Sequence, residues 1–344
     1  MITASPRLTI VHAALTNAFA GVERYVCQVA NGLSRRGHHL WVVGGLPGRM
    51  IAELDAEVHH RPAAGMMHGT LALARLHPDI VHVHMTAAEL AAWVSQSATR
   101  APVVATRHFA RPRGSSPPAR IAARLASRSI TIEIATSRYV ADIVGGRSRV
   151  IYHGVPDQPA ASLDTSRVVM LQRLEVEKAT DVGIRAWAES RLSEDGWRLV
   201  VAGEGEQRPK LERLAGDLGV GASVDFVGPV DDTAGLLDGA AAFLAPASVE
   251  AFGLSVVEAM AHALPVVAAA GGGHLETVGD VGLLFSPGDA RAAGAHLRTL
   301  AADPGTRREI GACLRRRQQE RFTLVQHLDE LESLYRELCP IPVE

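Results

Sequence analysis

Cysteine is rare in this chain, and its spacing excludes two kinds of structure. The three cysteines, Cys27, Cys313 and Cys339, lie far apart and include no C-x-x-C pair. An odd number of widely spaced cysteines is not the pattern of a disulfide-stapled domain or of a zinc-binding motif. We therefore expect a protein of the reducing cytoplasm without a structural metal.

Aromatic residues, net charge and long apolar runs are also low. Aromatic residues make up 4% of the chain, and the formal net charge is −2. Nucleic-acid binding relies on stacking side chains and positive charge, so we expect no nucleic-acid partner. The segment Met1–Leu8 lacks the apolar core of a secretion signal, and no apolar run is long enough to cross a bilayer. We expect any membrane contact to be peripheral, at the inner face of the cell membrane.

The sequence does contain a regular alternation of short apolar runs and amphipathic segments. Hydrophobic residues form 47% of the 344 residues, which fits two domains with buried cores. A helical pattern from about Val22 to Arg36 repeats apolar residues every three or four positions. Alternating strands and helices predict parallel sheets with helices on both faces. In the first half, strands are expected at Leu8–His12, Leu40–Val43, Ile80–His84, Val103–Thr106, Ile130–Ala135 and Val150–Tyr152.

The same pattern restarts after a polar segment with two prolines, residues 156–166. The predicted fold class is α/β, with two Rossmann-like, doubly wound domains. We place these domains at residues 1–155 and 156–322, and expect a final helix in residues 323–344 to pack back on the first domain. Ligands of such folds bind at the carboxyl ends of the strands, so we expect a cleft there. In the second half, strands are expected at Val168–Leu171, Leu199–Ala202, Val224–Val227, Ala242–Leu244 and Val266–Ala268.

The segment with the most specific chemistry is residues 245–270, APASVEAFGLSVVEAMAHALPVVAAA. A strand ends at its start, and a helix is expected from about Ser255. The N-terminus of a helix that follows a strand attracts anions, and Gly253 allows the backbone to approach a ligand closely. Glu258 lies one turn inside this helix, where a carboxylate suits ribose hydroxyls better than phosphate. Glu250, at the tip of the strand, is placed to bind hydroxyls of a transferred sugar.

Glu250 and Glu258 form E-x7-E within the pattern P-x-x-x-E-x-F-G-L-x-x-x-E-A-M-A-x-x-x-P-V-V. This pattern resembles the retaining glycosyltransferases with the GT-B fold, known as glycosyltransferase family 4 or glycosyl transferases group 1. The resemblance implies a nucleoside diphosphate sugar as donor, either UDP- or GDP-linked, and no cofactor or metal. The donor-binding residues implied in this segment are Phe252, Gly253, Leu254, Ser255 and Glu258.

Two more loops of the second half agree with the resemblance. Arg173 ends a strand and Lys178 opens the next helix, which resembles the family's G-R-L…K-G clamp on the donor diphosphate. Two cations suit a leaving group whose negative charge grows as the glycosidic bond breaks. Gln172 and Ala179 stand where the family usually has glycine. The resemblance also places two positions beside the donor and its base, namely Gly203 and Val230.

The first half contributes Gly21, in the segment A-G-V-E-R-Y, which resembles the family's first loop. There the backbone N–H of Gly21 would face the diphosphate and the acceptor. The neighbouring Glu23 and Arg24 are explained equally well as residues that begin a helix.

Histidines follow two strands of the first half. His108 comes just after the strand Val103–Thr106, and the resemblance implies that it contacts the donor sugar near the reacting centre. His82 and His84 form H-x-H on one face of a strand, but no third ligand is near them in sequence. We therefore expect no metal site. Four other histidines are interpreted as surface residues: His38, His39, His59 and His60.

A basic segment contains Arg120, Arg124 and Arg128 at intervals of four, beside Ile121 and Leu125. On a helix, this pattern fits a peripheral membrane contact of an enzyme with a lipid-linked acceptor. It also fits a solvated helix face near the acceptor cleft, and both interpretations stay open.

The function predicted is transfer of a hexose-like sugar to an acceptor hydroxyl with retention of configuration, an EC 2.4 reaction. The candidate catalytic residues are His108, Glu250, Arg173 and Lys178. The acceptor, whether glycan, glycolipid or small molecule, has no signature in the sequence. A GT-B sugar-nucleotide epimerase and a non-catalytic sugar-nucleotide-binding protein are the alternatives. A dehydrogenase is disfavoured, because Arg208 replaces the third glycine of a G-x-G-x-x-G motif.

Overall fold

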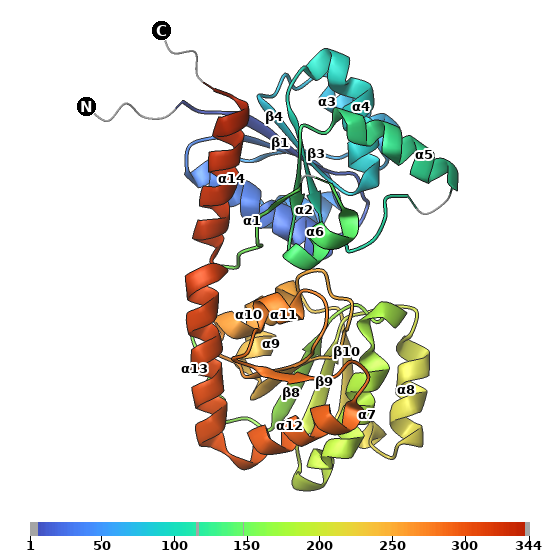
Figure 1. The fold of residues 1–344 in the computed structure, drawn as a ribbon, viewed down its shortest axis with the longest axis vertical. Coiled ribbons are helices and arrows are strands. Elements are labelled where there is room, and N and C mark those ends of the chain that lie inside the picture. The colour runs from blue at the N-terminus through green and yellow to red at the C-terminus, as the bar shows by residue number, and fades with distance from the viewer. Residues whose placement is uncertain (1–5, 115–116, 147, 341–344) are drawn as a thin grey trace, which may run out of the picture. The chain divides into compact units, whose positions relative to one another are not determined.

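The chain forms two compact units in the computed structural model, which describes residues 6–114, 117–146 and 148–340 (Figure 1). Unit 1 contains the chain up to Ile151 and again from His327 onward, and unit 2 is Tyr152–Gln326. We predicted boundaries at 155/156 and 322/323, a few residues from these divisions. Within the described residues, no helix is both long and apolar enough to cross a membrane.

Unit 1 is built on a sheet of seven parallel strands in the order β3-β2-β1-β4-β5-β6-β7. The order runs outward from β1 in one direction and then reverses at β4, so the switch point lies between β1 and β4. The strands are β1 (Thr9–Ala14), β2 (His39–Gly44), β3 (His59–Arg61), β4 (Ile80–His84), β5 (Val103–Arg107), β6 (Ile132–Ala135) and β7 (Ser148–Val150).

Helices flank this sheet (Figure 1). Along β1 and β4, side chains alternate between the two faces: Val11 and Val81 enter a core beneath α3 and α4, while His12 and His82 point to the opposite face. The helices of unit 1 are α1 (Gly21–Arg35), α2 (Pro47–Glu53), α3 (Met66–Leu73), α4 (Thr86–Thr99), α5 (Pro117–Ala126), α6 (Arg138–Val144) and most of α14 (Leu324–Leu338), with a short 3₁₀ turn at Ser127–Ser129.

Unit 2 repeats the design with six parallel strands in the order β10-β9-β8-β11-β12-β13. Its switch point lies between β8 and β11. The strands are β8 (Arg167–Leu171), β9 (Arg198–Ala202), β10 (Val224–Gly228), β11 (Ala242–Ala245), β12 (Val266–Ala269) and β13 (Leu283–Phe285).

Apolar cores cover both faces of the second sheet. Val168 and Met170 of β8 pack in one core with the fully buried Trp187, and Val169 packs in the other with Phe243. Because both faces of the sheet are covered, the strands must be apolar on both faces. Their sequences are therefore continuous apolar runs rather than alternating polar and apolar residues. The helices are α7 (Thr180–Ser190), α8 (Arg208–Asp217), α9 (Thr233–Asp238), α10 (Leu254–Ala261), α11 (His274–Thr277), α12 (Ala290–Ala302) and α13 (Pro304–Arg321), with 3₁₀ turns at Val176–Lys178, Leu192–Asp195 and Gly221–Ser223.

The predicted α/β architecture of two doubly wound domains is confirmed. Two strands were missed, β3 and β13, which have three residues each and lie at sheet edges. The surface assignment of His38 was wrong: its ring is buried, and its Nδ1 accepts a hydrogen bond of 3.2 Å from the N–H of Leu8.

Candidate functional site

The candidate donor site of unit 2 begins at the switch point of its sheet. The loop after β8 carries Arg173 and Lys178, and the loop after β11 carries Glu250 and Gly253. Because β8 and β11 are neighbouring parallel strands, both loops leave the same edge of the sheet. Two motifs that are far apart in sequence therefore meet.

A short ion pair connects these two loops. The ammonium Nζ of Lys178 lies 2.5 Å from Oε2 of Glu250, and about 18% of each side chain is exposed. The other oxygen of Glu250 accepts a hydrogen bond of 3.1 Å from the backbone N–H of Ala251. Burial alone raises the pKa of the Glu250 carboxyl, but Lys178 and His274 outweigh it, and the net pKa is below the ordinary value. Glu250 is therefore ionised at neutral pH.

Arg173 has a different setting. Its Nη2 lies 2.8 Å from Oε1 of Glu177, and close to half of each side chain is exposed. An exposed pair of this kind contributes little to stability, so Arg173 is available to an anionic ligand.

The two residues that replace the usual glycines have defined roles in this loop. The side-chain amide of Gln172 donates hydrogen bonds to the carbonyl of Lys178, at 3.1 Å, and to Oγ1 of Thr180, at 2.8 Å. Ala179 adopts a left-handed conformation with φ of 48°. Gln172 thus fixes the path of the loop that carries Lys178, and Ala179 accepts a conformation that favours glycine.

The first residues of α10 follow a glycine that no larger residue can replace without strain. Gly253 has φ of 89°, and a Cβ there would meet Cδ2 of His274 at 3.0 Å. The helix then starts at Leu254 and Ser255, whose half-buried positions lie at its N-terminus. The first N–H groups of a helix find no partner inside it, which makes this end attractive to anions. Glu258, half-buried, lies one turn further on.

The other predicted donor-site residues are more structural in character. Phe252 is buried and packs edge-on against His153 at 5.6 Å between ring centroids. Gly203 has φ of 131°, and a Cβ there would lie 1.9 Å from the carbonyl oxygen of Gln172, so the loop after β9 packs tightly on the loop after β8. Val230 is half-buried just after β10. Their contacts with a donor stay predictions.

Sequence reasoning missed the glycines that support the Glu250 loop. A Cβ on Gly272 would lie 2.3 Å from the carbonyl oxygen of Glu250, and a Cβ on Gly273 would lie 2.6 Å from that of Ala251. His274, which follows them, is buried beside Glu250. The available signal was the run G-G-G-H between a strand and a helix, the position at which α/β folds approach a ligand closely.

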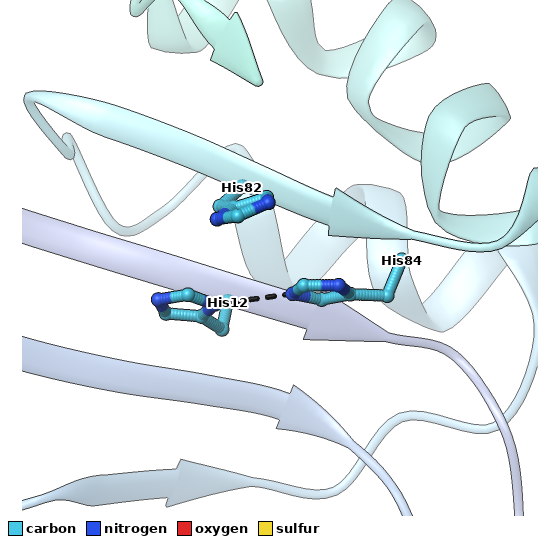
Figure 2. Close-up of side chains that lie close together, drawn as sticks. All are labelled: His12, His82 and His84. Atoms are coloured by element: carbon cyan, nitrogen blue, oxygen red, sulfur yellow. Dashed lines mark hydrogen bonds between the residues drawn. The ribbon is translucent and has the colours of Figure 1, made fainter. Parts of the chain in front are cut away.

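In unit 1, the switch point is occupied by histidines. His12 of β1 pairs in register with His82 of β4, and His84 lies two residues further on the same face. Candidate ligand atoms of these three buried rings lie within 4.8 Å of one another (Figure 2). The third histidine comes from a strand 70 positions earlier, so the H-x-H pattern alone could not reveal it. Proximity makes the group a candidate metal site, while the expected absence of a metal stays a prediction.

His108 joins this group at the end of β5. Its Nε2 lies 2.9 Å from Nδ1 of His84, and burial lowers the pKa of His108 to about 3, with a smaller contribution from His327. His108 is therefore neutral at pH 7. It also lines a cavity of about 430 Å³ in unit 1.

Arg107, Arg113 and Glu89 line the cavity, and both arginines also pair with Glu133, which is not part of the lining. Arg113 lies 2.6 Å from Glu89 and 3.0 Å from Glu133, and Arg107 lies 3.1 Å from Glu133. Arg111, whose guanidinium lies over the ring of Phe109, adds a further positive charge to the lining. The residues that line this cavity include none of the predicted donor residues of unit 2.

The segment around Gly21 is explained mainly by the start of α1. A Cβ on Gly21 would meet no atom of the described residues within 4 Å, so no contact among them requires glycine there. Glu23 is buried, and its carboxylate accepts hydrogen bonds from the N–H of Ala20, at 2.9 Å, and from Oγ1 of Thr16, at 2.6 Å. Glu23 thus caps the helix rather than binding a ligand.

The basic segment lies on α5 and just after it. Arg120, Arg124 and Arg128 are exposed, and so are Ile121 and Leu125, at 66% and 37%. Only small residues of this segment, such as Ala123, face the core. Both interpretations of this segment, a peripheral membrane contact and a solvated helix face, therefore stay open.

Consecutive parts of the chain match two family sequence patterns. Residues 19–158 match the pattern described as Glycosyltransferase Family 4, and residues 156–317 match Glycosyl transferases group 1. The chain belongs to glycosyltransferase family 4.

The curated relatives of this family 4 chain are longer than it is. The D-inositol 3-phosphate glycosyltransferase of Mycobacterium tuberculosis is 32% identical over 284 residues, 70% of this chain and 58% of that protein. The enzyme of the same name from Acidothermus cellulolyticus is 34% identical over 215 residues, 54% and 48% of the two chains. An exopolysaccharide phosphotransferase of Streptomyces coelicolor is 31% identical over 171 residues, 48% and 18%. The chain spans less than two thirds of each of these relatives.

Solved structures share the whole architecture. HepE of Anabaena, in complex with UDP and glucose, has a TM-score of 0.84 and 21% identity, and the match covers 97% of this chain and all of that one. A sucrose-phosphate synthase of Thermosynechococcus elongatus has a TM-score of 0.78 and 21% identity over 97% and 99% of the two chains. These similarities show that the fold is GT-B.

Proposed function

We propose that this protein transfers a sugar from a nucleoside diphosphate sugar to an acceptor hydroxyl, with retention of the anomeric configuration. The observation that carries the proposal is the Lys178–Glu250 pair at the switch point of unit 2, beside the N-terminus of α10. The site combines an ionised carboxylate, which suits hydroxyl groups, with an ammonium and a helix N-terminus, which suit a diphosphate. Together these groups match a ligand that contains both. Relatives named as glycosyltransferases support the proposal, and they do not favour the epimerase.

The proposed role of Arg173, Lys178 and the start of α10 is to stabilise the departing diphosphate. Negative charge accumulates on its oxygens as the glycosidic bond breaks, and preorganised positive groups lower the barrier most at that moment. No metal is needed if these groups supply the positive charge. We therefore propose that UDP- or GDP-sugars bind without a metal or other cofactor, as HepE binding UDP suggests for UDP.

Glu250 and His108 are proposed to hold the transferred sugar. The Glu250 carboxylate stays ionised beside Lys178 and can only accept hydrogen bonds, which suits sugar hydroxyls. We assign no side-chain nucleophile. In this proposal the acceptor hydroxyl attacks from the side on which the phosphate leaves, and the phosphate takes its proton.

The acceptor is proposed to enter the cavity of unit 1 that His108 lines. Arg107, Arg113 and Glu89 in its wall offer both donors and acceptors to a polyhydroxyl compound. The basic segment on α5 and just after it, called the α5 segment below, has three exposed arginines and two exposed large apolar side chains. It supports a peripheral membrane contact of the kind a lipid-linked acceptor would require.

The proposal is tested by incubating the protein with UDP- and GDP-sugars, with and without candidate acceptors, and measuring free nucleotide. We expect acceptor-dependent release of one nucleotide that persists in excess EDTA. Proton NMR of the product should show the donor's anomeric configuration. Binding without release would instead identify a sugar-nucleotide-binding protein, and an inverted product would remove the retaining mechanism.

A further inference from the structure

Three histidines of unit 1 form a continuous chain of hydrogen bonds that ends at the cavity. Nδ1 of His12 lies 3.1 Å from Nε2 of His84, and Nδ1 of His84 lies 2.9 Å from Nε2 of His108. Each link therefore joins the δ nitrogen of one ring to the ε nitrogen of the next. His12 and His84 are buried, and His108 reaches the cavity.

The two end rings of this chain are neutral. Burial lowers the pKa of His12 to about 3 and that of His108 to about 3, and repulsion from His327 adds to both. A neutral imidazole has one N–H and one bare nitrogen, so it can donate on one side and accept on the other. With all three rings neutral, only two arrangements of protons satisfy both links: every ring is protonated on Nδ1, or every ring is protonated on Nε2.

The inner end of the chain distinguishes these arrangements. Nε2 of His12 is buried and has no hydrogen-bond partner among the described residues. If the rings were protonated on Nε2, this nitrogen would be an N–H donor without an acceptor, a kind of group that is rare in protein interiors. If they are protonated on Nδ1, only a bare lone pair is left unsatisfied, which is tolerated more often.

We propose that His12 and His84 are positioning residues that fix His108 as the tautomer with its proton on Nδ1. In this form Nδ1 of His108 carries the proton. The unprotonated Nε2 of His108 accepts a hydrogen bond from the Nδ1–H of His84. A nitrogen that already carries a proton cannot take another from an acceptor hydroxyl. His108 is therefore a hydrogen-bond donor to a substrate oxygen rather than a general base, an assignment that rests on the proposed function.

The arrangement of the rings disfavours a metal at this site. Both nitrogens of His82 are engaged, Nδ1 with the hydroxyl of Tyr335 at 2.5 Å and Nε2 with Oγ1 of Thr106 at 2.7 Å. The His82 ring lies over the His84 ring, with centroids 4.5 Å apart and planes inclined by 32° (Figure 2). A metal ion needs ring nitrogens with free lone pairs that point at one centre, and both nitrogens of His82 already have partners.

The direct test is nitrogen NMR of the full-length protein labelled with [15N]histidine, at neutral pH and without substrate. Spectra of His12→Leu, His84→Leu and His108→Leu assign the signals. We expect His108 to show a protonated Nδ1 and a bare Nε2, with a coupling through the hydrogen bond to His84. Protonation of His108 on Nε2 would overturn the proposal. So would zinc binding that displaces the signals of His12 and His84, because it would show a metal site.

The kinetic test uses two substitutions of His84. His84→Asn keeps an N–H near the position of Nδ1 and should retain kcat within about threefold, whereas His84→Leu should lower kcat about tenfold with KM little changed, part of the loss expected for a misplaced donor. Equal kcat values in both variants would contradict the positioning role. If the wild type transfers no sugar at all, the proposed function fails, while the tautomer is still read by NMR.

Discussion

Lys178 and Arg173 follow the same strand but differ in how strongly their charge acts. Lys178 is mostly buried against Glu250, whereas close to half of the Arg173 side chain is exposed beside Glu177. Charges interact more strongly where water is excluded. We expect Lys178→Ala to lower kcat/KM at least a hundredfold, the effect of losing one preorganised group at a developing charge, and Arg173→Ala to lower it somewhat less. Steady-state nucleotide release measures both.

The control for this prediction is Lys210→Ala. Lys210 is the only other lysine of the chain and is exposed on α8. It should keep the wild-type rate. Circular dichroism should show intact folds in all three variants. A wild-type rate in Lys178→Ala would show that Lys178 does not stabilise the departing diphosphate.

A substitution of Ala179 is expected to change the stability of the protein rather than its catalytic activity. Its φ of 48° places a Cβ in the left-handed region, at a cost of about 1–2 kcal/mol, and glycine avoids that cost but loses about 0.5–1 kcal/mol of chain entropy. We expect Ala179→Gly to raise the free energy of unfolding by about 0.5 kcal/mol in urea titrations. Ala263→Gly, at φ of 58°, is the matched substitution elsewhere in unit 2. A destabilised Ala179→Gly would show that this loop is not strained.

Single residues were predictable from the sequence, but their partners were not. The motif pointed to Glu250 and Lys178, yet their ion pair joins positions 72 apart and depends on β8 and β11 being neighbours. The histidine chain depends in the same way on the pairing of β1 with β4. A local sequence pattern predicts which face of the sheet a side chain lies on. The strand order determines which other side chains it contacts there.

At the scale of elements, strands with strong apolar character were easy to predict and edge strands were not. The strand Ile80–His84 was predicted at its observed bounds. In contrast, β3 consists of His59, His60 and Arg61, whose polar side chains give no strand signal. It forms because the exposed edge of β2 pairs with it, which is a tertiary effect.

The α5 segment leads to a prediction about membranes. We expect the protein to sediment with vesicles containing anionic phosphatidylglycerol. Each arginine near such a surface contributes about 1 kcal/mol, so the double variant Arg120→Gln/Arg124→Gln should bind about thirtyfold more weakly. Binding should also weaken at high salt.

The matched control changes two exposed arginines of unit 2, Arg213→Gln/Arg291→Gln, and should leave vesicle binding unchanged. A second variant, Ile121→Ser/Leu125→Ser, tests the apolar part of the segment. If neither α5 variant differs from the wild type, the segment is a solvated helix face.

At the scale of the whole molecule, buried neutral histidines link folding to pH. The pKa of His12 is about 3 and that of His108 is about 3, both because of burial, whereas an unfolded histidine has a pKa of about 6.5. These groups stay neutral in the folded protein and take up protons on unfolding. Their contribution to stability is thus fully present above pH 6.5 and is lost as the pH falls toward 3. Other buried histidines shift in the same direction, namely His38, His82, His262 and His274.

We therefore expect the free energy of unfolding to fall steeply between pH 6 and pH 5, before most carboxylates are protonated. Two histidines alone give a limiting slope of about 2.8 kcal/mol for each pH unit, because each proton taken up contributes about 1.4 kcal/mol. Urea titrations followed by circular dichroism measure this slope. His12→Asn should reduce this slope by the contribution of about one proton. His39→Asn, a substitution at an exposed position, should leave the slope unchanged. Equal slopes in the wild type and His12→Asn would mean that the ring of His12 is charged in the folded protein, and the neutral histidine chain would then be wrong.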